Sequence, residues 1–159
     1  MFLLIICMKK YRVIFLCSFL LFGFFASAQT KESNAGEWIK VSEDEDVTIS
    51  YNSDIVTGQN GNHYVWVKAV YHTPEWQKYF SRMIGSKVPV VTTRTKAEYD
   101  EIYSLVRVRQ VICYSKAGKK LYDSGDDRSA GWGFVNASDP VGIVGEYIEK
   151  HTQVISRHQ

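Results

Sequence analysis

The histidines of this chain are the first residues to weigh for catalysis or metal binding. They are His63, His72, His151 and His158. None of them forms the HxH or HExxH spacing that brings two imidazoles to one metal ion. No nucleophile elbow, phosphate-binding loop or dinucleotide-binding fingerprint occurs either. We therefore expect no catalytic residue, no cofactor and no metal ion, and we predict that the chain is not an enzyme.

Cys113 and the acidic pairs add no catalytic set to these histidines. Cys113 is the one cysteine of three that lies beyond the apolar N-terminal segment, and we expect it to be buried in a strand. Carboxylates stand together in the run 43–46 and at positions 126–127, both in stretches expected to be loops. We expect the run 42–46 to form a solvated turn. A calcium site is the alternative there, although the loop glycine and the spaced ligands of such a site are missing.

Arg107 and Arg109 are the first candidates for a partner surface. They are two positions apart in an extended stretch, so they share one face of the strand. One interpretation is a solvated stripe or an ion pair with carboxylates of a neighbouring strand. The other is a small basic patch that docks an acidic partner.

Trp76 and Tyr79 are the second candidates for a partner surface. A capping Thr73, Pro74 in the first turn and a stop at Gly85 predict a helix around them. Large apolar residues recur at i, i+3, i+4 and i+7 of this helix: Trp76, Tyr79, Phe80 and Met83. The stripe is core if the helix lies on a sheet, and it is an exposed patch that needs a partner if the helix protrudes.

Strands must position these candidates, and the stretch 103–114 has the strongest strand signal. β-Branched and aromatic residues dominate it, and neither Pro nor Gly interrupts it. Gly118 marks a turn, and a return strand is predicted through Leu121 and Tyr122. Strict alternation would place Val106, Val108, Ile112 and Tyr114 on one side, and Leu105, Arg107, Arg109, Val111 and Cys113 on the other.

Shorter strands and one long helix complete the pattern. Further strands are predicted at 37–41, 47–51, 63–71, 88–91 and 131–135. The stretch 96–102 is helix-compatible in composition, but we favour strand or irregular structure from Tyr99. A C-terminal helix begins at Ser138-Asp139-Pro140, and its apolar stripe is Val141, Val144, Ile148 and Ile155.

These elements predict an α+β domain. It would contain a single antiparallel β-sheet of about five to six strands. The helix 140–156 would pack on one face of the sheet, and a short helix would follow the third strand.

Residues 1–28 are expected to be a signal peptide. A basic stretch at 8–12 precedes an apolar core at 13–25, and Ala26-Ser27-Ala28 fits the small-residue cleavage rule. The apolar residues before Met8 are unusual for a signal, so Met8 is an alternative start. We expect a disordered leader at 29–36 and a single domain at 37–159.

Cleavage would change the charge of the chain. It would remove Lys9, Lys10 and Arg12, so that 19 basic residues become 16 against 17 acidic ones. A net charge near −1 gives no support for nucleic-acid binding. All four tryptophans and nine of ten tyrosines stay in the exported part, a bias that fits either a sheet with one solvated face or a binding surface. We expect the protein in the periplasm, on the outer surface or secreted, with membrane contact only through the signal segment.

The order of several short motifs resembles the surface-adhesin protein E-like family of small exported bacterial proteins. The motifs are Trp38-Ile-Lys-Val-Ser-Glu-Asp44, Tyr51 with Asp54 just beyond, Val65-Trp-Val-Lys68, Arg107 seven residues before Tyr114-Ser-Lys-Ala-Gly118, and Trp132 before Ser138-Asp-Pro-Val-Gly142. Together they cover nearly all of residues 37–150.

This resemblance implies an antiparallel sheet with a helix across one face and a role in surface adhesion or host-protein binding. Family members often carry a disulfide that ties the last helix to the region before the central strand. Here the region around Glu101 and the tail after His151 have no cysteine, so burial alone must hold the helix. We expect a matrix or envelope protein as the partner. A structural periplasmic or envelope subunit, for example a homodimer, is the alternative.

Overall fold

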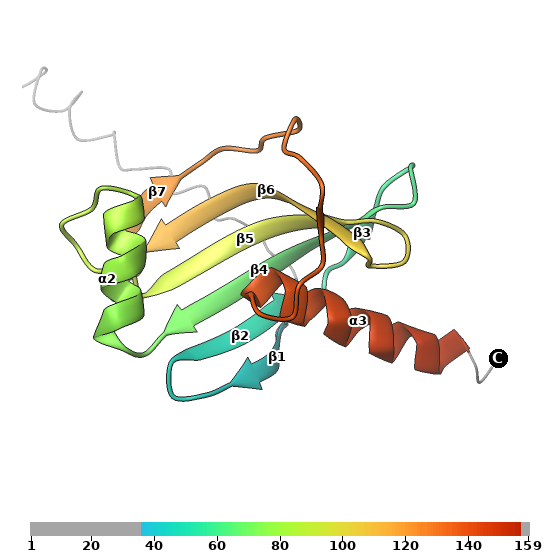
Figure 1. The fold of residues 1–159 in the computed structure, drawn as a ribbon, viewed down its shortest axis with the longest axis horizontal. Coiled ribbons are helices and arrows are strands. Elements are labelled where there is room, and N and C mark those ends of the chain that lie inside the picture. The colour runs from blue at the N-terminus through green and yellow to red at the C-terminus, as the bar shows by residue number, and fades with distance from the viewer. Residues whose placement is uncertain (1–35, 157–159) are drawn as a thin grey trace, which may run out of the picture. The chain divides into compact units, whose positions relative to one another are not determined.

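The domain is organised around one antiparallel sheet (Figure 1). A computed structural model describes the backbone of residues 36–156 and the side chains as far as His151. Its strands are β1 (Trp38–Glu43), β2 (Val47–Asn52), β3 (Val56–Thr57), β4 (His63–Tyr71), β5 (Thr92–Tyr99), β6 (Leu105–Tyr114), β7 (Lys120–Asp123) and β8 (Gly133–Phe134). The helices are α2 (Pro74–Met83) and α3 (Pro140–Ser156). The strand order is β1-β2-β4-β5-β6-β7, with β3 paired to β4 and β8 paired to β6.

The predicted fold class is confirmed, but two details of it are wrong. Every strand pairing is antiparallel, as expected. The sheet has eight strands instead of five to six, because the two-residue strands β3 and β8 extend the six-stranded path. For the same reason the short helix α2 follows the fourth strand and not the third.

The N-terminal predictions lie outside the described residues. These are the signal peptide 1–28 and the leader as far as residue 35. Between residues 36 and 156, no helix is long and apolar enough to cross a membrane.

Helix α3 runs across one face of the sheet, where it contacts β1, β2, β4 and β5 (Figure 1). Its buried Val144 and Ile148 join Ile49, Val65 and Tyr99 in the main core. This packing uses the apolar stripe that the 3.6-residue period predicts, with the side chain of Ile155 outside the described part. Among the described residues no disulfide ties the helix to the sheet. Burial holds it there together with one hydrogen bond, which the Tyr99 hydroxyl donates to the carbonyl oxygen of Val141 at 2.6 Å.

A β-bulge in β6 overturns the predicted division of its side chains. Gln110 pairs with Lys96 but Val108 pairs with Ala97, so Arg109 is an extra residue in the ladder. The extra residue shifts the alternation by one position. As a result, Val106 and Val108 share a face with Val111 and Cys113, which strict alternation had placed opposite them.

The region between α2 and β6 also differs from the prediction. Residues 88–91 form no strand; instead, the buried amide of Val90 donates a hydrogen bond to Ser81 Oγ at 2.9 Å. Residues 96–99 of the helix-compatible stretch belong to β5, which ends at Tyr99. Residues 100–104 form an irregular turn, within the strand or irregular structure that we favoured from Tyr99. β5 pairs with β4 on one side and with β6 on the other. This pairing outweighs the helix-compatible composition of the stretch.

Thr73 precedes α2, but its side chain does not cap the helix. Its hydroxyl oxygen is buried without a hydrogen-bond partner among the described residues. A buried hydroxyl without a partner costs about 1–3 kcal/mol. We expect Thr73→Val to raise the free energy of unfolding by about 1 kcal/mol in urea titration. Thr57→Val is the control, because that hydroxyl bonds to His63 Nδ1 at 3.1 Å, and it should give no gain. An equal effect of both changes would contradict this interpretation.

Candidate functional site

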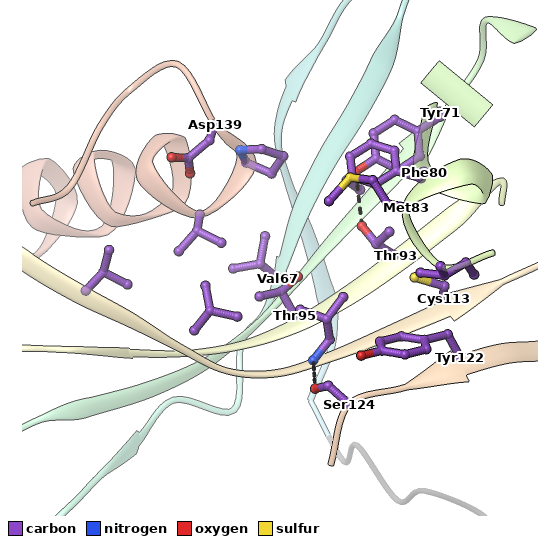
Figure 2. Close-up of a pocket in the computed structure, with 17 residues that line it drawn as sticks. Val67, Tyr71, Phe80, Met83, Thr93, Thr95, Cys113, Tyr122, Ser124 and Asp139 are labelled. Atoms are coloured by element: carbon purple, nitrogen blue, oxygen red, sulfur yellow. Dashed lines mark hydrogen bonds between the residues drawn. The ribbon is translucent and has the colours of Figure 1, made fainter. Parts of the chain in front are cut away.

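Two helices cover separate parts of one sheet face and leave the area between them open. At one end, Phe80 of α2 stacks on Tyr71 of β4 with 4.5 Å between ring centroids. Towards the other end, α3 covers Val65 and Tyr99. The uncovered area between the helices is a groove of about 550 Å³ (Figure 2). This volume lies within the range of sites that hold a small ligand or a few side chains.

The groove is built from segments far apart in the sequence. Strands β4, β5 and β6 supply its floor, including Val67, Thr95 and Cys113 (Figure 2). Met83 of α2 and Tyr122 of β7 stand at its edges, and both are exposed. The bulge in β6 adds Val106 and Val108 to this face, so the apolar floor depends on that one extra residue.

Four polar side chains of the groove already take part in hydrogen bonds. The hydroxyls of Tyr71 and Thr93 bond to each other at 3.2 Å. Ser124 Oγ accepts from the amide of Val111 at 2.9 Å, and Asp139 accepts from the amide of Gly142 at 2.7 Å. These groups stabilise the fold, so the property that the groove offers to a ligand is apolar surface withdrawn from water.

Burial also sets the protonation of two groups that line the groove. Burial raises the pKa of Tyr71 to about 12. It also raises the pKa of Cys113, whose side chain is almost fully buried. The thiol therefore stays protonated near neutral pH, and a thiol is a much weaker nucleophile than a thiolate.

The outer face of α2 continues the groove as an aromatic surface. Phe80 points inward, whereas Trp76 and Tyr79 are 43% and 52% exposed. Their rings meet edge to face at 5.7 Å between centroids. The predicted stripe is therefore divided between the two alternatives: Phe80 packs on the sheet, while Trp76 and Tyr79 face solvent. Met83, one helical turn after Tyr79, is 66% exposed and lines the groove.

Arg107 and Arg109 lie on the other side of the sheet, around a fully buried carboxylate. Glu98 of β5 accepts hydrogen bonds from Arg107 at 2.8 and 2.9 Å and from Arg109 at 2.7 Å. Asn62 donates to the same carboxylate at 2.7 Å, and Arg109 also pairs with Asp126 at 2.8 Å. Of the two interpretations of Arg107 and Arg109, the structure thus shows the one with ion pairs to a carboxylate of a neighbouring strand.

The environment of Glu98 keeps it ionised. Burial alone would raise its pKa, but hydrogen bonds from Arg107, Asn62 and Arg109 outweigh burial and lower the pKa to about 2. Arg109 is only 6% exposed, whereas Arg107 is partly accessible and its guanidinium lies 4.7 Å from the centre of the Trp132 ring. A docking role for these two arginines stays a prediction.

The sequence interpretation missed Glu98 because it treated residues 96–102 as helix-compatible. A signal was present in strict alternation: the charged Arg94, Lys96 and Glu98 alternate with Thr95 and other small or apolar residues. The groove had no comparable signal, because its floor and edges come from six separate elements.

No protein-family model, no curated protein and no solved structure matches this chain. The resemblance to the surface-adhesin protein E-like family therefore stays a prediction.

Proposed function

We propose that this chain is an exported, non-enzymatic binding protein of the adhesin type. It docks a protein partner, such as a matrix or envelope protein, on the groove and the outer face of α2. We call this combined area the docking surface; it consists of the groove residues around Val108, Met83 and Tyr122 together with Trp76 and Tyr79. Export rests on the signal-like segment before Gln29.

The observation that carries the proposal is the exposed apolar area of the docking surface. All five of these side chains are large, apolar and at least 41% exposed. Scattered exposed apolar residues are normal, but a contiguous group beside a groove is typical of an interaction site. Trp and Tyr are also the residue types that contribute most to binding energy at protein interfaces.

Charges beside the docking surface favour one kind of occupant. Lys78 and Arg82 stand next to Trp76 and Tyr79 on α2, where the four line one shallow depression with Glu75. Neither cation forms an ion pair with a carboxylate of the described residues. The partner that fits is a protein segment with apolar side chains for the groove and a carboxylate for α2.

Binding to a panel of purified matrix and envelope proteins tests this function. We expect at least one of them to bind in surface plasmon resonance. Val108→Asp should weaken that binding at least tenfold, because it places a charge on the groove floor, and Tyr79→Ala should weaken it by a similar factor.

Matched controls come from exposed apolar residues outside the docking surface. Val56 of β3 is 54% exposed and Phe134 of β8 is 85% exposed, and neither lines the groove. Val56→Asp and Phe134→Ala should leave binding within twofold. The proposal is wrong if no panel protein binds, or if both pairs of variants behave alike. Self-association in light scattering that Val108→Asp abolishes would instead favour the homodimer.

A further inference from the structure

A second cavity opens on the sheet face opposite the docking surface. Its volume is about 600 Å³, which lies within the range of small-ligand sites. Tyr64 and Trp66 of β4 line it; they alternate along the strand with Val67 of the groove floor, so they belong to the other face. We call it the charged cavity, because six charged side chains also line it: Asp54, Lys96, Arg107, Arg109, Asp126 and Arg128.

Most of these charges form one network around Glu98, and the network has an excess of positive charge. The carboxylate of Glu98 is shared by Arg107 and Arg109. The carboxylate of Asp126 is shared by Arg109 and Lys96. In the described chain, three cations of the network therefore face two carboxylates. Glu98 is fully buried and Arg109 is 6% exposed, so salt and water screen this excess less than they would on an open surface.

Arg128 adds a cation whose guanidinium has no partner among residues 36–151. Its carbonyl oxygen accepts from Arg107 at 3.4 Å, but its side chain is exposed and forms no ion pair or hydrogen bond there. Arg107 contacts Glu98 through Nε and Nη2, and a guanidinium has five N–H donors, so donors remain for a further acceptor. Both arginines line the charged cavity, so one ligand there has access to both.

Asp54 is the other charged group of the cavity outside the network. With Asp54 and Arg128 included, four cations of this described region stand against three carboxylates, and one positive charge remains. Asp127 does not line the cavity, and its carboxylate accepts hydrogen bonds from the amide and the hydroxyl of Ser129. A cleft with an excess of one sign of charge attracts ligands of the opposite sign. The charged cavity therefore favours an anion.

Aromatic rings give this cavity flat walls and hold its arginines in place. Tyr64 and Trp66 line it directly. The guanidinium carbon of Arg109 lies 5.9 Å from the centre of the Tyr64 ring, and that of Arg107 lies 4.7 Å from the centre of the Trp132 ring. Groups that are fixed before a ligand arrives lose less entropy on binding. A ligand that carries its charge on a planar apolar body uses both the arginines and the rings.

We propose that the charged cavity binds a small organic anion. Its carboxylate or phosphate group contacts Arg107 and Arg128, whose guanidinium groups match the geometry of such oxyanions. Its planar body lies against Tyr64 and Trp66. This site is independent of the docking surface, because it lies on the opposite face of the sheet and shares none of its residues.

Titration with benzoate, phenyl phosphate, acetate and benzamide, each at constant ionic strength, tests the site. The indole N–H resonance of Trp66, assigned with Trp66→Phe, reports binding in a ¹H–¹⁵N spectrum. We expect a saturable shift with benzoate or phenyl phosphate, and the tighter of the two identifies the preferred acid group. Acetate lacks the planar body and benzamide lacks the charge, so both should bind at least tenfold more weakly. No saturable shift with either aromatic anion, or equally tight binding of acetate or benzamide, would overturn the proposal.

Variants at Arg128 test the site and leave the network around Glu98 intact. Arg128→Gln should weaken binding of the tighter aromatic anion at least tenfold. Arg128→Lys should recover part of the loss, because it keeps the charge but not the planar fork of donors.

Arg82→Gln is the matched control for Arg128→Gln. Arg82 is an exposed arginine of α2 beside the docking surface and does not line the charged cavity, so this change should leave the affinity within twofold. Unchanged amide spectra of each variant would show that it is folded. Equal affinity in the two glutamine variants would overturn the proposal. A loss in Arg82→Gln alone would also overturn it, because the anion would then bind at the docking surface.

Discussion

Glu98→Ala is expected to lower the free energy of unfolding by about 3–5 kcal/mol, the usual cost of removing one partner from a buried ion pair. The variant would leave Arg109, which is 6% exposed, without the carboxylate that contacts it at 2.7 Å. Arg107 would lose two hydrogen bonds to the same group. Urea titration followed by circular dichroism measures the change. Glu101→Ala is the control, because Glu101 is exposed, and its effect should stay within about 0.5 kcal/mol.

The same carboxylate should make stability depend on pH. The pKa of Glu98 is about 2 in the folded protein, against an ordinary value of 4.5. The unfolded chain therefore binds more protons between these values, so stability falls as pH falls. The contribution of Glu98 should be complete above pH 4.5 and decrease progressively towards pH 2. Glu98→Gln should flatten this part of the stability curve; an unchanged curve would contradict the assignment.

Gly142→Ala is expected to destabilise the protein by about 3 kcal/mol, at the upper end of the cost of overpacking. A β-carbon at this position would lie 1.6 Å from the backbone carbonyl oxygen of Asn136. A backbone atom cannot rotate away, so the start of α3 and the loop at Asn136 would have to move apart. The intrinsic preference of helices for Ala, worth about 1 kcal/mol, opposes the effect but does not cancel it.

Gly131 provides the matched control for this prediction. A β-carbon there meets no atom within 4 Å, so Gly131→Ala should be neutral or slightly stabilising. Thermal unfolding of the two variants gives the comparison. If Gly142→Ala unfolds at the same temperature as Gly131→Ala, close packing is not the reason for glycine at position 142.

Local periodicity was enough to predict the elements with strong repeating patterns. The helix Pro140–Ser156 and the β6–β7 hairpin lie where their sequences indicate, and Gly118 has the positive φ, 75°, that its turn requires. In the helix and in the hairpin, the local apolar pattern is consistent with the burial of the segment in the fold. The antiparallel pairing of β6 with β7 followed from the short turn between them.

The features that local patterns missed depend on contacts between distant segments. The bulge at Arg109 has no signal in the residues around it, yet it decides which side chains of β6 face the groove. Glu98 was not singled out, because its burial requires Asn62, Arg107 and Arg109 to converge on it. Sequence predicted Trp76 and Tyr79 as candidates, but the groove that extends their surface is formed only by the folded chain.

The methyl resonance of Met83 offers the most direct test of the docking surface. Met83 is the only methionine beyond residue 8, it is 66% exposed, and it lines the groove one helical turn after Tyr79. The measurement is a ¹H–¹³C spectrum of methyl-labelled protein during titration with the panel protein that binds best. Binding on the docking surface predicts that the Met83 resonance shifts or broadens, with smaller effects in Val108→Asp. A Met83 resonance that stays unchanged at saturation would contradict the proposed site.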